Sequence, residues 1–142
     1  MKKYLIPTML VCCFTLFSQT VTAEDKRVMV KLPQMMQEHM LSSMRAHLEA
    51  INTILALINA DELDKAATVA EQELGMSALE KHSAKHMAQF YPDGMQQAGT
   101  AMHHAASQFA RIVEEGDPVN SYKALQNITN TCVGCHSGYR VR

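Results

Sequence analysis

The feature that most limits the fold is a set of long amphipathic runs, each bounded by proline or glycine. The first run begins at Pro33 and continues to about Asn59. Its apolar stripe recurs every three or four positions and comprises Met36, Met40, Met44, His47, Ile51, Ile54 and Ile58. Proline is tolerated in the first turn of a helix, and this spacing places one apolar stripe along a helix. The sequence therefore predicts a long amphipathic helix over residues 33–59.

A second helical arm is predicted with a break inside it. Asp61 is a candidate N-cap for a run over residues 61–74, and Gly75 then interrupts that run. Ser77 is a candidate N-cap for a continuation over residues 77–91. We therefore expect this arm to be bent or split.

Two more helices follow the turn signal at residues 92–94. One is predicted over about 95–115, and the other from Val119 to Tyr139, after Gly116-Asp117-Pro118. No segment combines two-residue alternation with turn chemistry, so strands are not expected. Four helical arms with short connectors predict an all-α fold, an antiparallel up-down-up-down four-helix bundle.

The N-terminal segment has the layout of a secretory signal peptide. Lys2 and Lys3 precede an apolar run from Tyr4 to Phe17, and a small-residue cleavage site, Val21-Thr22-Ala23, follows. The apolar run of roughly 14 residues is shorter than the ~20 that a membrane-spanning helix needs. The sequence therefore predicts a cleaved signal peptide over residues 1–23, and an exported, single-domain mature chain over residues 24–142 with no membrane span.

Cleavage of the signal peptide changes the net charge and the number of cysteines in the mature chain. Without Lys2 and Lys3, eleven basic side chains face fourteen acidic ones, a net charge of −3. This excludes a nucleic-acid binder that relies on general basicity. Cys12 and Cys13 also leave with the signal peptide, and the two remaining cysteines exclude a scaffold of several disulfides.

Those two cysteines belong to the motif Cys132-Val133-Gly134-Cys135-His136. C-x-x-C-H is the attachment signature for a c-type haem. Each thiol can form a thioether with one vinyl group of the porphyrin, and the adjacent imidazole can then bind the iron. On a continuous helix Cys132 and His136 lie one turn apart with Cys135 beside them, so all three are expected to point into the bundle. The motif predicts one covalently attached haem c, with His136 as the proximal axial ligand.

Three other readings of the motif are weaker. A structural zinc site needs four ligands, and no second cysteine or histidine pair follows in the last six residues. A thioredoxin-like redox pair lies at a helix start after a strand, whereas this one lies near the end of a terminal helix. An incidental disulfide explains neither the histidine nor the export signal.

The C-terminal residues CVGCHSGYRVR resemble the class II c-type cytochromes, the cytochrome c′ family, which place C-x-x-C-H-x-x-[YF]-R near the C-terminus. The resemblance is specific over Cys132 to Arg140 and extends to the rest of the mature chain only as an order of helices. It implies a left-handed four-helix bundle, a periplasmic location and frequently a homodimer. It also implies that Arg140 lies near the proximal ligand or the haem propionates.

The other face of the iron is expected to meet the first half of the first helix, which lies beside the end of the last one in such a bundle. Met36, Met40 and Met44 lie there, and thioether sulfur is a known sixth ligand, although a methionine stripe is also an ordinary core. In the family that the chain resembles, the distal residue is Leu, Phe or Met partway along this helix, at a place corresponding to Ser43 or Met44. Met44 lies on the apolar stripe and is the first choice, followed by Met40 and Met36. His47 is the last candidate, since a buried, hydrogen-bonded histidine is its more ordinary role.

The remaining histidines suggest no separate site. His82 and His86 have the i, i+4 spacing of a chelating pair, but no third ligand is evident, and both are expected on an exposed helix face. His103 and His104 are expected to be partly solvated, with one of them near the haem edge or the first helix.

Two functions compete. The first is an electron carrier that works with redox partner proteins, with a six-coordinate Met/His haem. The alternative is a five-coordinate haem protein that binds small gases such as nitric oxide or carbon monoxide. An enzyme is not expected, because no set of residues supplies a nucleophile, a base and an oxyanion donor together.

Overall fold

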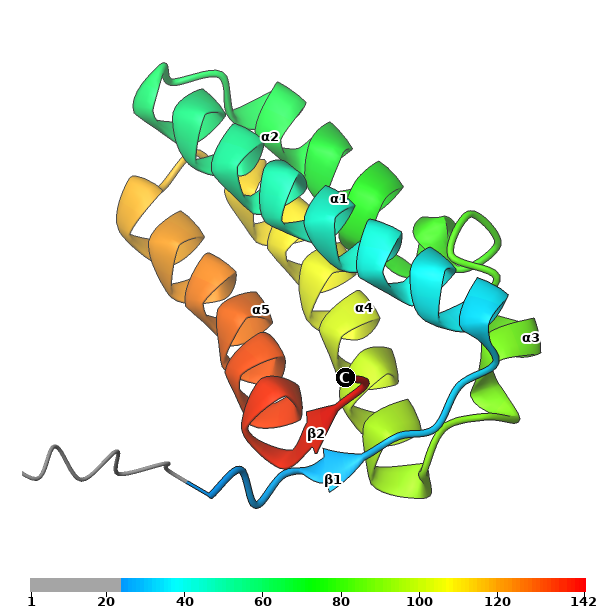
Figure 1. Cartoon of the computed structure of the whole chain (residues 1–142). Helices are drawn as coiled ribbons and strands as arrows, with labels where there is room; N and C mark the ends of the chain where they lie inside the picture. The colour runs from blue at the N-terminus through cyan, green and yellow to red at the C-terminus, as the bar shows by residue number, and fades with distance from the viewer. Residues whose placement is uncertain (1–23) are drawn as a thin grey trace, which may run out of the picture.

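The computed structural model describes residues 24–142, and most of them are helical (Figure 1). The predicted signal peptide, residues 1–23, lies outside the described residues. Among the helices of the described part, none is long and apolar enough to cross a membrane.

The first predicted helix is confirmed as α1, Gln34–Asn59, with Pro33 directly before it in an extended conformation. Met40, Ala50, Ile54 and Ile58 are its buried residues, and all four belong to one face. The buried face of α1 is therefore the apolar face expected from the helical spacing.

The second arm is split, as expected, but into more pieces than the sequence predicted. It comprises α2 (Leu63–Val69), a π-helix η1 (Ala70–Leu74), a 3₁₀ turn η2 (Met76–Ala78) and α3 (Ala84–Ala88). The prediction of one helix over residues 77–91 was wrong, since only a 3₁₀ turn and one short helix form there. At the break, a Cβ atom on Gly75 would lie 2.5 Å from the Glu71 carboxylate, so only glycine leaves room for that side chain.

Neither predicted cap of this arm forms. Asp61 adopts a positive φ of 57° in the turn, and the N-cap position falls on Glu62, whose side chain makes no capping hydrogen bond. Ser77 lies inside η2, where its backbone N–H donates to the Glu71 carboxylate at 3.0 Å. The Glu71 side chain thus accepts from the backbone of Ser77, and Ser77 does not cap a following helix.

The last two helices form close to their predicted bounds, as α4 (Asp93–Val113) and α5 (Pro118–Gly138). α5 begins with a strong cap: the Asp117 carboxylate accepts hydrogen bonds from the backbone N–H groups of Val119 at 2.8 Å and Asn120 at 3.4 Å. Pro118 occupies the first turn, where its missing N–H costs nothing. α5 therefore has a capped N-terminus and continues without a break to Gly138.

The expectation of no strands was wrong at the two ends of the described chain. β1 (Val28–Met29) pairs in parallel with β2 (Tyr139–Arg140), and the backbone N–H of Val30 donates to the Arg140 carbonyl at 2.8 Å. These segments are too short for two-residue alternation to show in the sequence. Their pairing closes the end of the molecule where α5 terminates (Figure 1).

The interior has two apolar clusters, on different stretches of the same helices. The aliphatic core lies among α2, η1, the C-terminal half of α1, most of α4 and the first part of α5; its buried members include Ile54, Ile58, Leu74, Phe109, Val113 and Ile128. The methionine cluster lies at the other end of the chain's helices and contains the buried residues Val30, Met40, Met87 and Met95. α4 packs most extensively on α5, and α1 packs mainly on α2 and η1.

Candidate functional site

The two cysteines of the motif face different clusters. Cys132 packs against the aliphatic core and Cys135 against the methionine cluster, and both are free thiols that are half-buried. Burial raises the pKa of both thiols above the ordinary value, so both are neutral at pH 7. α5 thus places two thiols, one turn apart, at the boundary between the two clusters.

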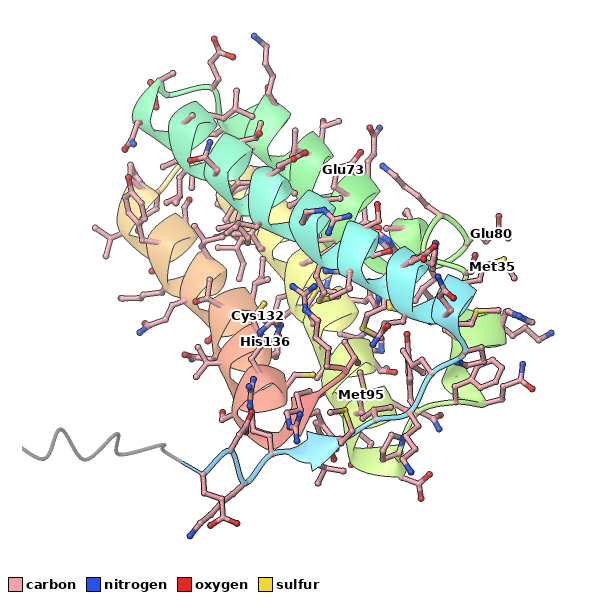
Figure 2. All side chains as sticks on the ribbon, in the orientation of Figure 1. Met35, Glu73, Glu80, Met95, Cys132 and His136 are labelled. Carbon is pink, nitrogen blue, oxygen red and sulfur yellow. The ribbon has the colours of Figure 1, made fainter. Side chains whose placement is uncertain are left out.

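His136 differs from the expectation that all three motif residues point inward. Its side chain is exposed, while its backbone carbonyl accepts a hydrogen bond from Arg27 Nη1 at 3.3 Å. His136 is about 40° from Cys132 and about 100° from Cys135 around the helix axis, so it lies at the edge of the face that the two cysteines share. Figure 2 shows Cys132 and His136 on α5, with Met95 near the start of α4.

The methionine cluster brings the predicted distal candidates to the motif. Met40 is 7% exposed, and Met36 and Met44 are partly buried and pack against the same cluster as Cys135. Met87 and Met95, at 2% and 8% exposed, complete it from α3 and α4. Met87 was not predicted as a site residue. It was assigned to one helix over residues 77–91, whereas in the structure it lies on the short helix α3 and packs in the methionine cluster. The high methionine count was the only sequence signal that could have found it.

Two tyrosines border the same cluster. Burial, reinforced by Cys135, raises the pKa of Tyr91 to about 12, so its phenol stays neutral. A Cβ atom on Gly94 would meet the Tyr139 hydroxyl oxygen, so glycine at the start of α4 makes room for that hydroxyl. Tyr139 and Val141, which follow α5, therefore cover the cluster from the C-terminal side.

Arg140 carries an unsatisfied buried donor. Its Nε atom is buried and finds no hydrogen-bond acceptor among residues 24–142, although it lies 3.4 Å from Asp25 Oδ2. That separation allows an ion pair but not a well-aligned hydrogen bond. The Asp25 carboxylate is already committed to Arg27, which donates from Nε at 2.9 Å and from Nη2 at 2.7 Å. Arg140 is therefore positioned to bind a further carboxylate.

The histidines follow the predictions in part, and His103 lies near the first helix as one of the expected pair, with its ring centroid 6.5 Å from that of His47. His86 is exposed on α3, as expected, but His82 is partly buried in the turn before α3 and its ring lies against that of His47, with ring centroids 4.6 Å apart. His103 is buried rather than partly solvated, and its Nδ1–H donates to the Leu74 carbonyl at 2.8 Å. The last candidate for the distal ligand, His47, thus has its ring against that of His82.

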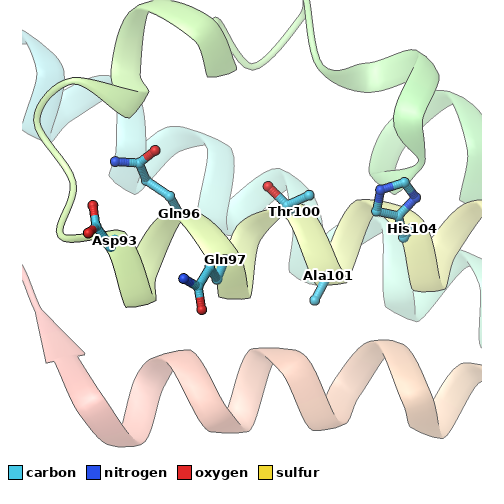
Figure 3. Close-up of a pocket in the computed structure, with 6 residues that line it drawn as sticks. All are labelled: Asp93, Gln96, Gln97, Thr100, Ala101 and His104. Atoms are coloured by element: carbon cyan, nitrogen blue, oxygen red, sulfur yellow. The ribbon is translucent and has the colours of Figure 1, made fainter.

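A shallow hollow on α4 offers no alternative site. It is lined by Asp93, Gln96, Gln97, Thr100, Ala101 and His104, and Figure 3 shows that all six come from this one helix. Its residues are polar or small and include neither the cysteines nor the methionines. The hollow is open surface rather than an enclosed binding site.

The residues of the methionine cluster and of α5 fit a covalently held haem. Two half-buried thiols stand beside an apolar wall rich in thioether sulfur, and a buried guanidinium nitrogen lacks an acceptor that a propionate would provide. Within residues 24–142, no group of three His, Cys, Asp or Glu side chains is arranged to hold a metal ion. No protein-family model, curated protein or solved structure matches this chain.

Proposed function

We propose that the mature chain is a periplasmic monohaem c-type cytochrome that transfers electrons, in which a four-helix bundle holds one haem c through Cys132, Cys135 and His136. The observation that carries this proposal is the meeting of Cys135 with Met40 and Met44 in one apolar cluster. The attachment motif and a wall of candidate thioether ligands come from opposite ends of the described chain. A haem held at the motif would therefore have an apolar, sulfur-rich surface within reach.

Each residue of the site has a separate task in this proposal. Cys132 and Cys135 anchor the porphyrin edge, and their neutral thiols are protected by burial until they react. His136, whose side chain is exposed, would bind the iron. The buried Nε of Arg140 donates to a propionate. Bound in this way, haem supplies a one-electron redox centre.

Met44 is proposed as the sixth ligand, with Met40 as the second choice. Both pack in the methionine cluster, and a thioether ligand raises the reduction potential of haem iron. A six-coordinate centre leaves no open position for a gas, which is why the electron carrier is preferred to the gas-binding protein.

Covalent attachment is tested by replacing both cysteines. The Cys132→Ser/Cys135→Ser variant should lose all haem after denaturation in acid and organic solvent, whereas the wild type should stay red. The matched control is Val133→Ser, because Val133 lies between the cysteines and is 66% exposed, so its replacement keeps the motif intact. Retention of red colour by the double variant would refute the attachment.

The sixth ligand is tested by optical spectra of the oxidised and reduced protein. Met44→Ala should convert a low-spin spectrum to a high-spin one and remove the sulfur-to-iron charge-transfer band. Met35→Ala on the same helix is the control, since Met35 is 72% exposed and should leave the spectrum unchanged (Figure 2). A wild type that is already high-spin and shifts with carbon monoxide would replace the electron carrier by the gas-binding protein.

A further inference from the structure

Charge is unevenly distributed over the described part of the chain. The segment before α1, residues 24–32, and the last ten residues, 133–142, together carry five basic and two acidic side chains. The residues between them, 33–132, carry six basic and twelve acidic side chains. An acidic protein therefore has two positively charged segments. We call residues 24–32 and 133–142 the basic end.

Hydrogen bonds hold the two segments of the basic end together. β1 pairs with β2, and the backbone N–H of Val30 donates to the Arg140 carbonyl at 2.8 Å. Arg27 Nη1 donates to the His136 carbonyl at 3.3 Å. In Figure 1, β1 and β2 lie together where α5 ends. The two basic segments therefore adjoin each other in space, next to the end of the attachment motif.

Three of the five basic side chains are free to meet another molecule. Lys26, Lys31 and Arg142 are exposed, and none of them forms a salt bridge within residues 24–142. The other two, Arg27 and Arg140, both lie beside one carboxylate of the same segment. The three exposed cations therefore have no partner among the described residues.

The positive excess does not depend on Arg140. That side chain is assigned to a haem propionate, which would neutralise it. Without Arg140, four basic side chains still face two acidic ones at the basic end. A second propionate nearby would leave four positive charges against three negative ones. The basic end therefore remains positively charged when haem is attached.

Apolar side chains are exposed among these charges. Val28 and Met29 of β1 are 54% and 39% exposed. Val133, three residues before His136 on α5, is 66% exposed. Single exposed apolar residues are common, so the charge asymmetry carries the argument. In a docking surface, however, such residues supply apolar contact while the charges set orientation.

The charge of the rest of the molecule limits what can bind at the basic end. An extended anionic surface, such as a membrane or a long nucleic acid, would also come near residues 33–132. Their excess of six negative charges would repel it. A protein with an acidic patch of limited size can meet the basic end alone. Unequal charge of this kind also orients two approaching proteins and speeds their encounter.

We propose that the basic end is the docking surface for an acidic redox partner protein, whose carboxylates meet Lys26, Lys31 and Arg142. This inference rests on the proposed electron-transfer function and adds the charge of the partner to it. Docking at the basic end places the partner beside the end of α5, the helix that carries the attachment motif. The acidic remainder of the chain faces away from the partner and discourages other orientations.

A fluorescent decaglutamate peptide with a blocked N-terminus is the probe for this surface. It is mixed with the full mature chain at pH 7 and low ionic strength, and binding is followed by fluorescence anisotropy. The wild type should bind this anionic peptide although its own net charge is −3. The affinity should fall steeply as salt is added to about 0.15 M, where the Debye length is about 8 Å.

Two double variants with the same net charge locate the binding surface. Lys26→Gln/Lys31→Gln should weaken the affinity about fivefold, as expected for the loss of two exposed ion pairs. The matched control is Lys65→Gln/Lys123→Gln, which should change the affinity less than about twofold. Lys65 and Lys123 are also exposed, but they lie near the starts of α2 and α5, away from the end of α5.

Carbodiimide coupling gives the position of the peptide directly. The reagent joins a peptide carboxylate to a lysine amine as an amide, and the carbodiimide takes up the water that is lost. Mass spectrometry of the digested product should find the peptide on Lys26 and Lys31. Coupling mainly at Lys65 or Lys123 would contradict the proposal.

Three further outcomes would overturn it. They are no binding of the peptide by the wild type, equal losses in the two double variants, and tighter binding to phosphatidylglycerol vesicles than to the peptide. The last outcome would make the basic end a membrane contact. None of these measurements needs haem. A protein with covalent haem that does not bind the peptide would lose this docking surface and keep its proposed function, whereas a chain that binds the peptide but never holds haem would do the reverse.

Discussion

The aliphatic core and the methionine cluster are built from different side chains and hold their helices differently. In the aliphatic core, alanines such as Ala66, Ala70 and Ala106 are fully buried and allow close contact around Phe109 and Ile54. In the methionine cluster, long thioether side chains fill the interior, and several of them are only partly buried. Short, shape-fixed side chains define packing closely, whereas methionine adapts to irregular space.

This difference assigns the two clusters different roles. The close packing of α4 with α5 through the aliphatic core fixes where α5 lies and hence where the motif lies. The methionine cluster provides a wall that can adjust to a flat, rigid group. The aliphatic core therefore fixes the positions of the helices, whereas the methionine cluster can adapt its side chains to a different occupant.

The largest expected effect is in the aliphatic core. Phe109→Ala removes a fully buried ring and should lower the free energy of unfolding by about 3–5 kcal/mol. Urea denaturation followed by circular dichroism measures this change. Phe90→Ala is the control, because Phe90 is only partly buried and should cost much less. Equal losses at the two positions would show that burial in the aliphatic core is not the source of the effect.

A smaller loss of stability is expected on acidification, through the protonation of His47 on α1. The pKa of His47 is lowered to about 4 by burial and by His82 and His103, against an ordinary value of 6.5. Between these values the unfolded chain binds a proton that the folded chain does not, so stability is full above pH 6.5 and falls as the pH decreases to 4. The loss should reach about 3 kcal/mol at pH 4.

Thermal unfolding at several pH values tests this dependence. His47→Gln should flatten the decline, and the remaining slope comes from His103, whose pKa is lowered in the same direction. The exposed His104 is the control, and His104→Gln should leave the slope as it is. A wild type whose stability is constant from pH 6.5 to 4 would remove His47 as the cause.

A still smaller effect is expected inside the methionine cluster. Met87→Leu nearly conserves volume and should cost less than about 1.5 kcal/mol, although Met87 is 2% exposed. Urea denaturation provides the measurement. A loss as large as that of Phe109→Ala would show that the methionine cluster is packed as closely as the aliphatic core.

The smallest effect is expected at the exposed edge of the methionine cluster. The hydrogen bonds from Arg27, with Arg140 nearby, lower the pKa of Asp25 to about 2. The stabilisation from this carboxylate is present above its ordinary value of 3.8 and disappears as the pH falls toward 2. Asp25→Asn should make the acid limb of the stability profile shallower, because it lowers stability slightly at pH 7 and not at pH 2, where the wild-type carboxyl is already losing its charge. A change in the slope of the profile above pH 5 would be inconsistent with this origin.

The sequence predicted the elements that depend on local patterns. The stripe of α1 and the break at Gly116-Asp117-Pro118 before α5 were readable because periodicity and helix-breaking residues act locally. The cap that Asp117 provides was not predicted, and the two predicted caps, Asp61 and Ser77, do not form.

The break before residues 77–91 is accompanied by one tertiary contact, in which His103 of α4 donates to the carbonyls of Leu74 and Gly75, 29 and 28 positions away. No local pattern encodes this contact.

The candidate site divides in the same way. The motif itself was visible in the sequence, and its meeting with Met40 and Met44 followed from the predicted order of helices. The exposed direction of His136 and the grouping of His47, His82 and His103 were not predicted. The exposure of His136 depends on the rotation of α5 about its axis, because neighbouring residues on a helix face different directions. The grouping of the histidines depends on the place where the second arm breaks.

The pairing of β1 with β2 has a consequence for the order of folding. It joins segments at the two ends of the described chain, and the nearby contact from Arg27 to the His136 carbonyl spans 109 positions. Contacts between such distant residues form late, because the entropy of closing the loop must be met first. The last turn of α5 therefore remains uncovered while the helices assemble. Until these contacts form, the backbone at Tyr139 and Arg140 and the His136 carbonyl stay open to solvent or to another molecule.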